Sequence, residues 1–502
     1  MTELKNFLET PWNREVLHPI YQDSFLHMYP APGYGTGEIL LASLYRNVGL
    51  NLGEGQVPKH GREFNKNIQK SLRPDNNKSA INIDNTEWKR LITRSLSSPK
   101  QPNQAKNRFL QINPIVPDAA IYSLAARLTG NPWNPGLLVA NALCYGAEND
   151  DKALELWQEI FDHLSIDEDG DDIWARLLQA EFQTWRSKSL EGVWERPAKL
   201  PDKLGVYAGL QQVNHPAKRF AKDLKIILSL KDQLTRRQWL TMLESILRLG
   251  TASHTMWLCN LNFTCFDILE NVLKGNEPPS ESSLIDMFSL QDNFWGIGDK
   301  SNKTIMDKAV DYTVGRLGTN LILWYCHQSN EIDVPTNALS SPLAFANFTR
   351  QIHEKSNQFP LKEYLDSYQK VIEKDPRIPA CKSGISKNIV EFLKYNLQQR
   401  TTLETGMGSY DQGYYLKQAA PKAPWKVSLG PVSIVAMSFC CTSAIKGPRT
   451  VADLKHHLAL YGFNIETQQD NDFIRLLRSL NLVLDSPDAE GGMVLLNFFE
   501  KH

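Results

Sequence analysis

The chain has 502 residues, of which 42% are hydrophobic and 22% are charged, and its formal net charge is −1. This composition is typical of a folded protein, and the length predicts roughly two to four domains. The near-zero net charge excludes a polycation, so any nucleic-acid surface has to be local.

Seven cysteines are scattered without regular spacing, and no Cys-x-x-Cys pair occurs. The odd count argues against a disulfide framework, and the spacing argues against a structural zinc site. The N-terminus lacks a basic start followed by an apolar core, and the one long uncharged run, 427–445, is interrupted by Gly430 and Pro431. We therefore expect a cytoplasmic protein with no membrane partner, no metal and no cofactor.

The N-terminal region, residues 1–130, contains a basic polar excursion at 56–108 with twelve lysines and arginines against four acidic residues. Its other residues are mostly polar, so we expect little apolar burial and one short helix at 86–96. Dispersed cations bind a phosphate backbone by releasing counterions, which is one interpretation of this segment. The alternative interpretation is a solvated loop without a ligand. The candidate phosphate contacts are Lys59, Arg62, Lys66, Lys70, Arg73, Lys89, Arg90 and Arg94.

Residues 131–379 form the second predicted domain, in which apolar residues recur at helical spacing. In its best-defined part we expect three consecutive helices, at 236–249, 253–261 and 263–273. Thr235 is expected to cap the first of them and Gly250 to end it. Prolines 376 and 379 mark the boundary to a C-terminal domain at 385–502.

The C-terminal domain opens with a predicted helix at 386–400 and a predicted loop at 401–426, in which tyrosines and a tryptophan are interleaved with lysines. Aromatic residues beside lysines can stack bases while the lysines pair with phosphates, although such aromatics also fix loops to their own domain. Residues 429–499 then have the pattern of three helices and a β-hairpin. Pro431 suits the start of the first helix, Thr450 the cap of the second and Gly462 its end.

This order of elements resembles a winged helix, the helix-turn-helix variant whose wing is a terminal β-hairpin. The resemblance implies a module that binds nucleic acid or another protein. Candidate phosphate contacts in and before it are Lys417, Lys422, Lys426, Lys446, Arg449, Lys455, Arg475 and Arg478. Asp470 and Asp472 at the start of the third helix, together with acidic residues in the wing, would repel phosphates. The sequence therefore disfavours base-specific recognition through these elements and favours backbone contact or protein docking.

No group of residues predicts a catalytic site, because the histidines are dispersed and no nucleophile has a matching base. Glu87 and Lys89, with Asp75 upstream, match an acid, acid-x-lysine nuclease pattern, but that chemistry needs carboxylates on paired strands. The sequence thus predicts a mainly α, multi-domain, non-enzymatic subunit that binds the backbone of nucleic acid, with duplex DNA and other protein subunits as its partners. Its composition is similar to that of accessory components of bacterial DNA-processing or antiviral defence assemblies. A helical adaptor whose winged helix binds protein and a metal-dependent nuclease are the alternatives.

Overall fold

The computed structural model is mainly helical, as the sequence predicts. It describes residues 2–28, 37–50, 84–96, 113–121, 134–167, 169–185, 194–290, 300–329, 332–400, 411–418, 420, 423–444, 447–465, 467–484, 492–497 and 499. Most of the predicted basic excursion 56–108 lies outside these residues.

The elements follow one another along the chain in three groups. The first contains α1 (Thr2–Glu9), α2 (Pro19–Gln22), α3 (Gly37–Val48), α5 (Asn85–Leu96), α6 (Pro117–Ile121), α7 (Pro135–Gly146), α8 (Asp150–Leu164) and α9 (Ile173–Trp185). The second contains α10 (Pro216–Leu228), α11 (Arg236–Leu273), α12 (Glu281–Phe288), α13 (Lys300–Ser329), α14 (Pro342–Glu354), α15 (Leu361–Lys374) and α16 (Gly384–Leu397). The third contains β1 (Leu416–Gln418), β2 (Trp425–Val427), α17 (Pro431–Ser443), β3 (Arg449–Thr450), α18 (Val451–Ala459), α19 (Thr467–Ser479), β4 (Val483–Leu484) and β5 (Val494–Leu495).

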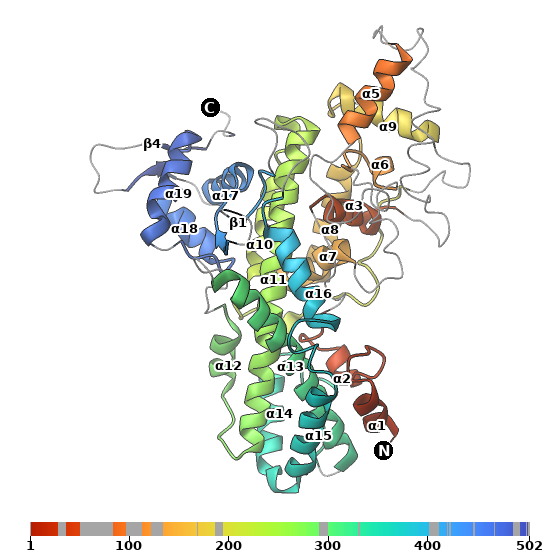
Figure 1. The fold of residues 1–502 in the computed structure, drawn as a ribbon, viewed down its shortest axis with the longest axis vertical. Helices are drawn as coiled ribbons and strands as arrows, with labels where there is room; N and C mark the ends of the chain where they lie inside the picture. Colours follow the sequence, from red (N-terminus) through yellow and green to blue (C-terminus); the bar gives the residue numbers. More distant parts are fainter. Residues whose placement is uncertain are drawn as a thin grey trace.

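Helix α11, with 38 residues, lies at the centre of the molecule and packs against α10, α13, α16 and α17 (Figure 1). Its start is capped as the sequence predicts, because the Thr235 backbone N–H donates to Gln238 Oε1 at 3.1 Å. The expectation of three separate helices between 236 and 273 is wrong. Gly250 does not end a helix; a Cβ there would lie 2.1 Å from a ring carbon of Phe220. The glycine instead lets α10 approach α11 closely.

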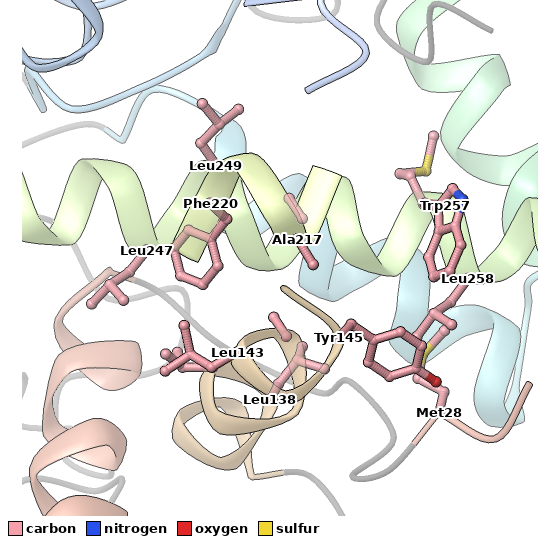
Figure 2. Close-up of a cluster of buried hydrophobic side chains, with 14 of the residues drawn as sticks. Met28, Leu138, Leu143, Tyr145, Ala217, Phe220, Leu247, Leu249, Trp257 and Leu258 are labelled. Atoms are coloured by element: carbon pink, nitrogen blue, oxygen red, sulfur yellow. The ribbon is translucent and has the colours of Figure 1, made fainter. Parts of the chain in front are cut away.

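The hydrophobic core follows α11 and is continuous from Leu4 to Leu495, so it includes buried side chains from all three predicted domains. Figure 2 shows one part of it, where Tyr145 of α7 and Phe220 of α10 lie beside Leu247 and Trp257 of α11. Trp257 also donates its indole N–H to the Phe288 carbonyl at 2.9 Å. The domain boundaries near residues 130 and 380 stay predictions.

Two arginines of α11 are buried and neutralised by carboxylates. Arg236 lies 2.9 Å from Asp171, in the loop before α9. Arg248, three helical turns further on, lies 2.9 Å from Asp411 and 3.4 Å from Glu244, and it also donates to the carbonyls of Asn396 and Gln398. Burial opposes the charge of Arg248, but Asp411 and Glu244 outweigh it and raise the pKa of the guanidinium. Because both side chains are satisfied by partners from distant segments, they fix those segments to α11.

The last elements form a compact unit, called here the C-terminal unit and comprising α17, β3, α18, α19, β4 and β5. Its helices and terminal hairpin lie where the sequence predicts them, but β3 was not predicted. The strands form a sheet in the order β3-β5-β4, in which Arg449 pairs with Leu495 and Val483 pairs with the same residue from the other side. A capping box at Thr450 starts α18, since its Oγ1 accepts the Asp453 N–H at 3.3 Å.

One buried carboxylate, that of Asp223, forms hydrogen bonds between α10 and the C-terminal unit. Asp223 of α10 accepts hydrogen bonds from His457 Nε2 at 2.7 Å and Tyr461 OH at 2.8 Å, both on or just after α18. Its other oxygen is paired with Arg219. Burial would raise the pKa of Asp223, but the hydrogen bonds and charges of His457 and Arg219 outweigh it and lower that pKa.

No described helix is both long enough and apolar enough to cross a membrane. All seven cysteines are free thiols, and six of them are buried.

The Arg248 cluster predicts a large loss of stability when the guanidinium is removed. Arg248→Met should lower the free energy of unfolding by about 3–5 kcal/mol, because two buried carboxylates lose their counter-charge. Arg90→Met is the matched control, because its ion pair with Glu87 is exposed (73% and 39% of the two side chains) and should matter little. Urea unfolding followed by circular dichroism measures both; equal midpoints for R248M and the unmodified protein would contradict this assignment.

Buried histidines predict a loss of stability in mild acid. Burial lowers the pKa of His18 and His27 to about 4 and that of His254 to about 3, from 6.5. Because the folded-state values lie below the unfolded ones, this stability is complete above pH 6.5 and is lost as the pH falls from 6.5 toward 4. The unfolding midpoint should decrease as the pH is lowered from 7 to 5, and it should decrease less steeply in His254→Gln. An unchanged pH dependence in that variant would contradict the prediction.

Candidate nucleic-acid interface

The structure describes nine of the sixteen predicted phosphate contacts. Lys89, Arg90 and Arg94 lie on α5, Lys417 on β1, Lys426 on β2, Arg449 on β3, Lys455 on α18, and Arg475 and Arg478 on α19. The other seven, Lys59, Arg62, Lys66, Lys70, Arg73, Lys422 and Lys446, lie outside the described residues. Helix α5 is on the opposite side of α11 from α18 and α19 (Figure 1), so the nine cations form two separate surfaces.

The first surface is α5, the helix expected at 86–96. Trp88, Ile92 and Leu96 are buried on one face, and the Trp88 ring meets Trp174 of α9 edge-on at 6.0 Å. Arg90 and Arg94 are exposed on the other face. Arg90 is paired with Glu87 at 2.8 Å. A phosphate would therefore have to compete with a carboxylate for Arg90.

The second surface centres on the hairpin of β1 and β2, which lies in the later part of the segment predicted as a loop at 401–426 and corrects that part of the prediction. Residues 401–410 of the segment lie outside the described residues. The hairpin residues alternate: Leu416 and Val427 are buried, whereas Lys417 and Lys426 are exposed and directly opposite each other in the antiparallel register. Like charges opposite each other destabilise a strand pair. Among the described residues, no carboxylate lies within ion-pair distance of either lysine. The pair is thus the strongest described candidate for an anion contact.

The hairpin is held by a tyrosine that the sequence suggested as a base-stacking residue. Tyr415 is fully buried, and its hydroxyl lies 2.9 Å from Ser245 Oγ of α11. Ser245 in turn lies 2.9 Å from Ser433 Oγ of α17. Tyr415 therefore anchors the hairpin to its own protein, which was the alternative interpretation of these aromatics, and its ring is inaccessible to a base.

A groove of about 470 Å³ lies between this hairpin and α19. Its lining comprises Lys417, Lys426, Val427, Ser428, Leu429, Ile465, Asp472, Phe473 and Leu476. Asp472 is the one carboxylate in that described lining, and Arg475 Nη1 lies 3.4 Å from its Oδ1. The groove therefore combines two lysines from the hairpin with an apolar floor and one carboxylate from α19.

The remaining cations of the C-terminal unit are less available. Arg449 has an 18% exposed side chain and lies 3.9 Å from Asp453. Arg475 and Arg478 are exposed and point away from the buried Phe473 and Leu477, as the helical spacing predicts. Arg478 also contacts the Met493 sulfur at 3.9 Å.

The described residues contain no cluster of three or more histidine, cysteine or acidic side chains that could hold a metal ion. Glu87, the candidate nuclease carboxylate, lies on helix α5 rather than on a strand, and Asp75 lies outside the described residues. Neither a protein-family model nor a curated protein sequence matches the chain.

Proposed function

We propose that this protein is a non-enzymatic, nucleic-acid-associated subunit of a larger assembly, and that its C-terminal unit is a winged-helix module. The order of the elements supports the second part of the proposal. The hairpin of β4 and β5 follows α17, β3, α18 and α19, which is the position of the wing in a winged helix. The first strand, β3, pairs with the last, β5, so the three strands form one sheet.

The observation that carries the proposal is the cross-strand pair of Lys417 and Lys426 at the rim of the groove. Two adjacent ammonium groups repel each other, and a phosphate between them removes that repulsion while its counterions are released. Lys455 and the exposed arginines of α19 would extend the contact along a phosphate backbone.

Backbone contact is favoured over sequence-specific reading of duplex DNA by α19. Asp472 is exposed on the first described turns of this helix, and a carboxylate entering a groove of duplex DNA would meet phosphates on both sides. The cations of α5 form a separate surface, so they would contact a different part of the same nucleic acid or a different ligand. Membership of a bacterial DNA-processing or defence assembly stays a prediction.

A second candidate function, a helical adaptor, is favoured by a second groove of about 540 Å³ between the starts of α11 and α17. Leu234, Met242, Val432 and Val435 line it, and its described lining contains Arg237 but no carboxylate. Such a groove suits an apolar segment of a partner protein that carries an acidic residue. An adaptor that never contacts nucleic acid would not retain DNA even at low salt.

The test is a binding titration of a labelled DNA duplex at two salt concentrations. Lys417→Glu/Lys426→Glu should weaken binding and reduce the slope of log K against log salt by about 2, because two phosphate contacts are lost. The matched control is Lys362→Glu/Lys370→Glu, two exposed lysines of α15 at the far end of α11, and it should leave the slope unchanged. Equal losses in both variants would indicate non-specific attraction and contradict the proposal. Failure of the unmodified protein to bind either this duplex or a single strand of the same length would also contradict it.

A further inference from the structure

The groove beside Lys417 and Lys426 has an apolar floor, and contact with the phosphate backbone of a nucleic acid does not require one. Val427 ends β2, Leu429 follows the hairpin, Ile465 precedes α19, and Phe473 and Leu476 lie on α19. A duplex keeps the flat faces of its bases stacked inside and exposes only their edges, within its grooves, so no base face could lie on such a floor. Apolar side chains next to two lysines instead suit a ligand with one anionic part and one flat, weakly polar part.

Asp472 opposes a phosphate but suits the edge of a base. A carboxylate accepts hydrogen bonds from exocyclic amino groups, such as N4 of cytosine. Thymine has carbonyls on both sides of its single ring N–H, so it would bring oxygen atoms against the carboxylate. One residue could thus distinguish amino-bearing bases from thymine.

We propose that this groove binds one unstacked nucleotide of a single-stranded nucleic acid. The base lies on the floor made by Phe473 and Leu476, its amino group donates to Asp472, and the neighbouring phosphates lie at Lys417 and Lys426. The groove volume of about 470 Å³ is within the usual range of about 300–1,000 Å³ for small-molecule sites. This inference rests on the proposed function and narrows its ligand from phosphate backbone in general to an unpaired strand.

The experiment compares labelled oligo-dC, oligo-dT and a duplex of the same length by fluorescence anisotropy. The unmodified protein should bind oligo-dC about tenfold more tightly than oligo-dT, since one good base contact provides about 1–3 kcal/mol of discrimination. Both single strands should bind more tightly than the duplex. Asp472→Asn should bring the dC to dT ratio close to one and strengthen binding of oligo-dT, because an amide donates to a thymine carbonyl and no longer repels phosphate.

Glu155→Gln is the matched control, because Glu155 of α8 is also an exposed carboxylate paired with a cation three residues away on its helix, and it lies outside both candidate surfaces. It should leave the dC to dT ratio unchanged. A duplex that binds as tightly as oligo-dC, or a D472N variant with an unchanged ratio, would overturn the inference. In that case a salt slope that still depends on Lys417 and Lys426 would leave the backbone proposal standing, whereas no binding to any probe would remove both.

Discussion

The structure depends on neutralising one guanidinium, that of Arg248, in the middle of its longest helix. An unpaired charge at this depth would cost several kcal/mol, so Asp411 has to lie beside it. Asp411 lies five residues before β1, and its Oδ1 also accepts the Gly413 N–H at 3.0 Å. The same guanidinium donates to carbonyls at the end of α16. The position of the candidate binding surface is therefore set by a charge in the core.

Local patterns in the sequence predicted most helices, the short helix at α5 and the terminal hairpin, because apolar spacing and caps such as Thr450 act over a few residues. They failed where a distant partner decides the outcome. Gly250 has the pattern of a helix end, but its role is to admit Phe220. The strands β1 and β2 have only three residues each, and they form because Tyr415 reaches Ser245 on α11.

The candidate site could likewise be predicted only in part, because contacts between segments far apart in the sequence decide its geometry. Residue types predicted that Lys417 and Lys426 belong to a basic surface, but only the antiparallel register places them opposite each other. Asp472 counted against nucleic-acid binding when considered as a charge alone. Its position in a groove with an apolar floor is what our proposal uses, in which this carboxylate accepts a hydrogen bond from a base. Helix α5 is far from this groove because α11 lies between them, and no local sequence pattern encodes that arrangement.

The carboxylate of Asp223 has a mechanical consequence. His457 and Tyr461 of the C-terminal unit both donate to this buried carboxylate, and Arg219 of the same helix α10 balances its charge, so the unit is attached to α10 by short hydrogen bonds as well as by the chain itself. A unit held in this way cannot swing like a domain on a tether. Tension on a strand bound beside α19 would be transmitted through α18 to α10 and then to α11, so the whole helical body would bear the load.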